Sequence, residues 1–214
     1  MTLTEIKRAL LFDYETELKS KINLIQHQHK SDWIRCKKKE TLTTIHFETK
    51  TKNKWRLLVQ TSQYSNQVLS YLCFYDEVGI NVYYLTTNLA PLAFLYYNTH
   101  FFKRYRERMK LNIEKPEDLI KHFIKNNIFM VPHAQENEGE KGRVFTRMDS
   151  GAGLGLGIYH EEGDIFEFKT FVDLSLLTEN QKKKMNEIFL EYFNKLMIAY
   201  EKRLPNIMHK LGLR

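Results

Sequence analysis

The chain has 214 residues, of which 43% are hydrophobic and 13% aromatic, so it has enough apolar mass for a packed core and is not intrinsically disordered. This length suits one domain, or one domain with a helical appendage, and we expect residues 1–214 to form a single domain. The net charge of +7 is compatible with two readings, solvated lysine-rich faces or contact with an anionic partner.

The predicted location is the cytoplasm. The two cysteines, Cys36 and Cys73, form no CxxC pair and are too few for a disulfide-rich secreted scaffold. The N-terminal stretch MTLTEIKRALLFDYETELKSK lacks the continuous apolar core of a signal peptide. No segment approaches the roughly 18 apolar residues that cross a bilayer, so we expect no membrane contact.

The first predicted element is a helix that begins near Thr4, which can cap it, and ends before the polar stretch 26–32. Its apolar positions fall at helical spacing: Ile6, Leu10, Phe12, Leu18, Ile22 and Ile25. Strands follow at 41–50 and 54–62, then a hairpin over 67–87 around the turn DEVG, then a short strand at 92–98. Short connections between these strands favour an antiparallel meander.

The second half of the chain begins with two predicted helices. The first spans 100–111 with Asn98 or Thr99 as its cap, and the second spans 114–127 with Pro116 in its first turn. Residues 133–142 are expected to form an exposed loop, and strands are expected at 143–149, 153–160 and 164–173. A long helix from Thr178 to Arg203 begins with a capping box to Gln181 and carries an apolar stripe.

These elements predict an α+β fold. We expect a curved antiparallel sheet, packed by helices at both termini and by a central helix pair.

The helix at 100–111 is amphipathic. Phe101, Phe102, Tyr105 and Met109 can face the sheet, while His100, Arg104, Glu107, Arg108 and Leu111 share the other side. Guanidinium groups match phosphate oxygens, and an imidazole transfers protons near neutral pH. The alternative is structural: the arginines pair with Glu107 or other acids, and His100 caps the helix or packs.

Two later strands carry unusual residues. Gly151, Gly153, Gly155 and Gly157 alternate, so one strand face is bare, which indicates close approach by a helix such as the terminal one, by another backbone or by a ligand, with helix packing favoured. In the next strand, alternation predicts that Phe166, Phe168, Thr170 and Val172 face one way, and that Ile165, Glu167, Lys169, Phe171 and Asp173 face the other. Lys169 either neutralises a phosphate or protects a sheet edge.

No cofactor or metal site is predicted. The glycines match neither GxGxxG nor GK[ST], and His27 and His29 have no partners at ligand spacing. No GxSxG sequence is present.

The order strand, HFFKRYRER helix, second helix, loop and strand hairpin ending in FKTFVD resembles the RelE-like RNase superfamily of bacterial toxins. The likeness covers residues 95–173 and leaves the N-terminal strands without a counterpart. The chain also resembles uncharacterised Bacteroidetes proteins whose family has no assigned activity.

The resemblance to the toxins implies metal-independent cleavage of RNA, in which the 2′-hydroxyl attacks the adjacent phosphate. His100 would act as base or acid, and Arg104, Arg108 and Lys169 would stabilise the phosphorane. The alternative is a non-enzymatic protein whose basic helix docks an acidic protein or nucleic acid. A third reading is a structural protein that forms oligomers by pairing its apolar terminal helix with a second copy. The sequence does not determine the oligomeric state.

Overall fold

The computed structural model describes residues 2–35, 41–61, 66–86, 93–127, 133–135, 143–147, 153–161, 164–183, 186–187 and 190. The chain divides into two compact units, Met1–Val172 and Asp173–Arg214. A single domain over the whole chain stays a prediction. Within the described ranges, no helix is both long and apolar enough to cross a membrane.

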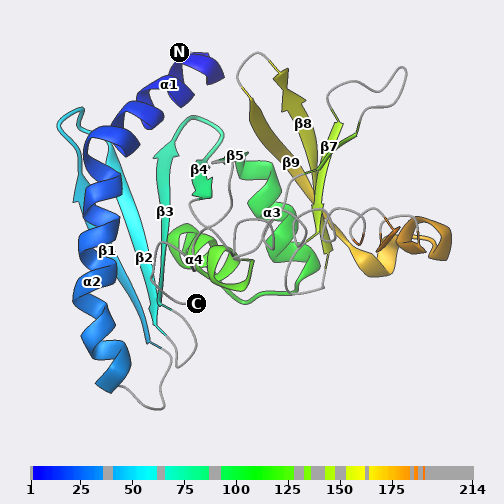
Figure 1. Cartoon of the computed structure of the whole chain (residues 1–214). Coiled ribbons are helices and arrows are strands. Elements are labelled where there is room, and N and C mark those ends of the chain that lie inside the picture. The colour runs from blue at the N-terminus through cyan, green and yellow to red at the C-terminus, as the bar shows by residue number, and fades with distance from the viewer. Residues whose placement is uncertain are drawn as a thin grey trace, which may run out of the picture. The chain divides into compact units, whose positions relative to one another are not determined.

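The first unit is built on one sheet, to which the described residues contribute nine strands in the order β1-β2-β3-β4-β5-β9-β8-β7-β6. The strands are β1 (Thr41–Glu48), β2 (Lys54–Thr61), β3 (Asn66–Tyr75), β4 (Ile80–Thr86), β5 (Ala93–Tyr97), β6 (His133–Gln135), β7 (Arg143–Arg147), β8 (Gly153–His160) and β9 (Ile165–Asp173). Helices lie on both sides of the β1–β5 part of the sheet (Figure 1). The predicted α+β class and the antiparallel meander over β1–β5 are confirmed.

One strand pair departs from the antiparallel prediction. β5 and β9 run parallel, with Tyr96 beside Glu167 and Tyr97 beside Phe168. A parallel neighbour requires a crossover connection instead of a tight turn. Here the crossover contains both central helices, so they are placed where the two halves of the sheet meet.

The N-terminal helical arm is longer than predicted. It consists of α1 (Leu3–Asp13), a π-helical segment η1 (Tyr14–Leu18) and α2 (Lys19–Arg35), so the polar stretch 26–32 does not end it. Its cap is Thr2 and not Thr4, because the Thr2 hydroxyl accepts the Glu5 amide while the Glu5 carboxylate accepts the Thr2 amide.

The π-helical segment aligns the two halves of this arm. Leu10 and Leu18 are eight residues apart, which in a pure α-helix would rotate them by about 80° out of line. The wider π turn takes up this difference. Leu10, Leu18, Ile22 and Ile25 are therefore all buried against one face of the sheet. Phe12, predicted on the apolar side, is 58% exposed.

A buried carboxylate attaches this arm to the β1–β2 turn. Asp13 is fully buried, and its oxygens accept hydrogen bonds from Thr51 Oγ1 (2.5 Å), Asn53 Nδ2 (2.7 Å), Trp55 Nε1 (3.0 Å) and Thr49 Oγ1 (3.2 Å). A buried charge requires such partners, so these bonds fix the arm's position on the hairpin.

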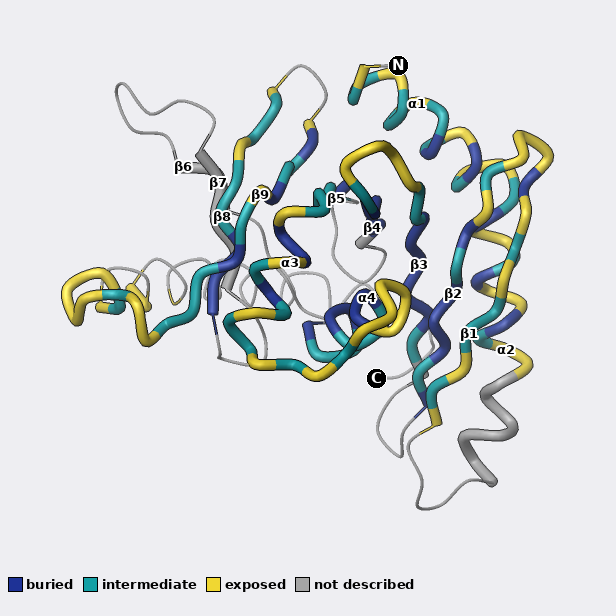
Figure 2. The backbone as a smooth tube through the Cα atoms, turned by 180° about the vertical axis from the view of Figure 1, so that it is seen from behind, coloured by how far each residue is buried: buried dark blue, intermediate teal, exposed yellow. Residues whose placement is uncertain are grey.

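The central helices α3 (Thr99–Arg108) and α4 (Pro116–Asn126) cover the opposite face of the sheet. Pro116 opens α4, Glu117 and Asp118 occupy its first turn and Lys125 its last, as predicted. Buried residues gather along β2, β3 and α4, whereas the loop from α3 to α4 is largely exposed (Figure 2).

Two predictions about the later segments have mixed outcomes. Residues 133–135 form β6 and are not a loop, while residues 136–142 lie outside the described residues. In the second unit, the capping box is confirmed, since Thr178 N donates to Gln181 Oε1 (2.9 Å) and Gln181 N donates to Thr178 Oγ1 (3.3 Å). The apolar stripe predicted after Thr178 lies outside the described residues, as do the contacts of the C-terminal helix.

Candidate functional site

Helix α3 is held at its N-terminus by Asn98 and not by His100. The Asn98 side chain accepts the Phe101 amide at 3.0 Å, which satisfies one of the free N–H groups of the first turn. The Thr99 hydroxyl instead donates to the Ile80 carbonyl at 2.9 Å, joining the helix to β4. His100 is therefore left exposed, without a capping role.

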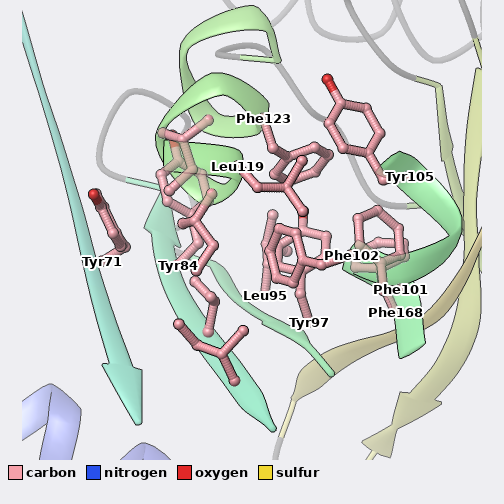
Figure 3. Packing of buried hydrophobic residues seen from close by; sticks show 14 of the residues in the cluster. Tyr71, Tyr84, Leu95, Tyr97, Phe101, Phe102, Tyr105, Leu119, Phe123 and Phe168 are labelled. Carbon is pink, nitrogen blue, oxygen red and sulfur yellow. The ribbon is translucent and has the colours of Figure 1, made fainter. Parts of the chain in front are cut away.

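The inner side of α3 is aromatic, as predicted. Phe101, Phe102 and Tyr105 are all buried, and Met109 packs partly buried against the same cluster. Phe101 lies 4.9 Å from Tyr97 between ring centroids and 5.2 Å from Phe123, and the rings gather between the sheet and α4 (Figure 3). These contacts fix the rotation of α3, because turning the helix would expose the rings.

The outer side of α3 carries cations. His100 and Lys103 are exposed, and Arg104 forms a surface ion pair with Glu107 at 3.0 Å, with exposed side-chain fractions of 43% and 41%. Arg104 therefore pairs with Glu107, as the structural alternative for this residue expected, although an exposed ion pair of this kind contributes little to stability. Lys103, Arg106 and Lys110 form no ion pair with any described residue.

Arg108 has a structural contact. Its guanidinium donates to the backbone carbonyl of Phe171 in β9. The side chain is half-buried at the border between the aromatic side and the cationic side of α3. Arg108 therefore joins α3 to β9, and only part of its guanidinium can meet a ligand.

Lys169 is placed on the other face of the sheet. Phe168 stacks on Tyr97 at 5.1 Å and contacts the α3 side, so its neighbour Lys169 points away from α3. Lys169 is 48% exposed and lies 3.8 Å from Glu167, whose carboxylate also meets His160 Nε2 at 2.8 Å. The structure brings Lys169 together with Glu167 and His160, not with the three candidate residues of α3.

The predicted alternation of β9 holds as far as Lys169 and is interrupted between Lys169 and Phe171. Phe171 was expected on the face opposite Phe168, but both rings lie near Phe101, at 6.3 and 6.5 Å between centroids. Phe171 also packs edge-on against Tyr105 at 5.2 Å. Burial against α3 therefore overrides strict alternation at this end of the strand.

At Gly153 and Gly157 the bare face of β8 is approached by β9, so of the three expected neighbours the described residues place another strand's backbone there. A Cβ at Gly153 would overlap the Phe171 ring, and a Cβ at Gly157 would overlap the Glu167 carbonyl. Gly153 thus makes room for a core aromatic ring, and Gly157 allows the close approach of the two strands. Gly151 lies outside the described residues.

Burial suppresses the reactivity of the remaining titratable groups near α3. Burial raises the pKa of Tyr105 to about 12, and the Tyr105 hydroxyl lies 3.1 Å from His122 Nδ1. Burial, together with the charge of Lys125, lowers the pKa of His122 below its usual 6.5. Burial also raises the pKa of Cys73 to about 11, so this thiol is a poor nucleophile at neutral pH.

No group of three or more His, Cys, Asp or Glu side chains in the described part of the chain is arranged to hold a metal ion. No protein-family model, curated protein or solved structure matches this chain. The sequence reasoning missed the His160–Glu167 pair, whose only advance signal was a histidine and an acid flanking the turn at 161–164. It also missed Asp13, because nothing in the sequence distinguishes this residue from the other 25 acidic residues.

Proposed function

We propose that the protein binds RNA, without cleaving it, through the outer side of α3. The observation that carries the proposal is the charge of this helix, where Lys103, Arg104, Arg106 and Arg108 stand against the single acid Glu107, a net +3. The inward packing of Phe101, Phe102 and Tyr105 turns the cations outward. Lysine and arginine side chains contact phosphates without regard to base sequence.

The placement of Lys169 supports binding over catalysis. A phosphorane-stabilising set needs its cations around one reacting phosphate. Lys169 faces away from α3, Arg104 is paired with Glu107, and Arg108 contacts a backbone carbonyl. The cations that remain on the outer side of α3 suit the phosphate backbone of RNA. The affinity for RNA would then arise from electrostatic attraction.

The test is fluorescence anisotropy with a labelled oligouridylate at several salt concentrations. The double variant Lys103→Glu/Arg106→Glu should lower the affinity at least tenfold and flatten its salt dependence, because each lost phosphate contact removes about 0.7 from the logarithmic salt slope of a single strand. The control Lys19→Glu/Lys52→Glu makes the same charge change at exposed lysines far along the chain from α3. Equal losses in both double variants would rule out α3 as the binding surface.

Metal-independent RNA cleavage is the second candidate function, and the exposure of His100 one turn from Arg104 favours it. Here His100 would move the proton of the attacking 2′-hydroxyl while Arg104, released from Glu107, would neutralise the phosphate. A reporter RNA is incubated with the protein and EDTA. Cleavage by the wild type that both His100→Ala and Arg104→Ala abolish establishes this function, and intact RNA leaves binding alone.

A further inference from the structure

Strand β1 is a long edge of the sheet that the described residues form. It stands first in the strand order and pairs with β2 over all eight of its residues, from Thr41 opposite Thr61 to Glu48 opposite Lys54. The opposite end of the sheet is β6, which has three residues. Proteins commonly keep edge strands short because an open edge is a template for another strand. The edge at β6 follows this pattern, and the edge at β1 does not.

The backbone groups that face outward from β1 follow from one hydrogen bond. Thr49 N donates to Asn53 O at 3.1 Å, so this pair is hydrogen-bonded. Hydrogen-bonded and non-bonded pairs alternate along an antiparallel ladder. Thr43, Ile45 and Phe47 therefore direct their N–H and C=O groups toward β2. Leu42, Thr44, His46 and Glu48 direct theirs away from the sheet.

The side chains of β1 do not obstruct an added strand. The sequence TLTTIHFE has no proline, glycine or lysine, and its register with β2 is unbroken, so the usual devices against strand addition are missing from β1. Ile45 and Phe47 are half-buried and pack against the cluster beneath the N-terminal arm. They form an apolar shelf that a strand laid along the edge would extend.

One end of the edge is basic. Lys50, Lys52 and Lys54 are exposed around the β1–β2 turn, and the Lys52 side chain, which pairs with Glu48 at 3.4 Å, is 82% exposed. Glu17 accepts the Lys50 amide at 3.0 Å, and the buried Asp13 contacts the same turn. Together with Lys21, four cations stand against these three acids, a net +1. On the shelf, the Lys21 ammonium lies 5.9 Å from the centre of the Phe47 ring. A strand that extends past Glu48 toward the turn meets cations, so complementarity selects an acidic segment.

We propose that β1 receives an extended acidic segment of a partner protein as a tenth strand of the sheet. Main-chain hydrogen bonds to the outward groups of Leu42, Thr44 and His46 supply the affinity, the shelf at Ile45 and Phe47 selects apolar residues at alternate positions, and the lysines select acids at one end. This surface is separate from α3 and does not depend on RNA binding.

Amide hydrogen exchange tests the edge directly. In the free protein the amides of Thr43, Ile45 and Phe47 should exchange slowly and those of Leu42, Thr44 and His46 quickly. The probe is a synthetic peptide of alternating valine and threonine that ends in three glutamates. It should slow exchange of the three outward amides at least tenfold. Slow exchange of these amides in dilute free protein would mean that the chain covers its own edge, and protection that grows with protein concentration would mean that a second copy does; either result overturns the proposal.

Two variants separate the backbone contribution from the charge contribution. Thr44→Pro removes one outward N–H and leaves the β1–β2 bonds in place, so peptide affinity should fall at least tenfold, whereas the matched control Thr44→Val keeps the amide and the affinity. Slow exchange at Ile45 in Thr44→Pro shows that the hairpin is still folded. The triple variant Lys50→Gln/Lys52→Gln/Lys54→Gln should weaken the acidic peptide but not a glutamine-ended one. Equal binding of both peptides by the wild type would refute the acidic chemistry, and binding of neither would refute strand addition.

Discussion

Replacing Asp13 by alanine should destabilise the fold more than any surface change. The carboxylate is fully buried and accepts hydrogen bonds from four side chains of the β1–β2 turn and β2. Alanine removes every acceptor at once. The four donors differ in whether water can replace the lost carboxylate. This difference sets the size of the loss in the free energy of unfolding.

Two of the four donors cannot be rehydrated. Trp55 and Thr49 are 1% and 2% exposed, whereas Thr51 is exposed and Asn53 is half-buried. A hydrogen bond to a charged group contributes about 1.5–3 kcal/mol, so losing the two buried ones costs about 3–6 kcal/mol. Alanine also removes the cost of burying a charge. We therefore expect a net loss of about 3–4 kcal/mol in the free energy of unfolding.

The assay is urea unfolding monitored by tryptophan fluorescence, with Thr51→Ala as the control. Thr51→Ala removes one donor at the surface and should cost about 1 kcal/mol. Asp13→Asn, which keeps one acceptor oxygen, should fall between the two. If Asp13→Ala were no more destabilising than Thr51→Ala, the buried network would not be what attaches the N-terminal arm to the hairpin.

Three further expectations concern other parts of the first unit. Gly157→Ala places a methyl group against the Glu167 carbonyl and should cost about 1–3 kcal/mol in urea unfolding, and a neutral result would mean that the two strands can separate. Asn98→Ala should cost about 1 kcal/mol through loss of the α3 cap, while Asn98→Gly should cost only a few tenths, and equal losses would contradict a capping role. The pKa of His122 is lower in the folded protein than in the unfolded chain, where it is near 6.5. The wild type should therefore lose stability relative to His122→Gln as the pH falls from about 6.5 to the lower folded pKa. Parallel stability profiles of the two proteins against pH would refute this.

The sequence by itself determined the local elements. The apolar spacing of Phe101, Phe102 and Tyr105 predicted which side of α3 is buried, and Asn98 was one of two named caps. Alternation and turn residues placed the strands of the meander to within a few residues. These features depend on neighbours close in the chain, where helical and strand periodicities apply directly. The outward display of cations on α3 could therefore be predicted before the fold was known.

Tertiary structure alone decided which elements meet. Alternation shows that Glu167 and Lys169 share a face, but it cannot show that this face lies away from α3, because that depends on the parallel pairing of β9 with β5. The contact of Arg108 with the Phe171 carbonyl joins residues 63 positions apart, and that of Asp13 with Trp55 joins residues 42 apart. Such contacts arise when the chain buries its apolar faces together, and no local pattern records which distant partner each polar group will then find.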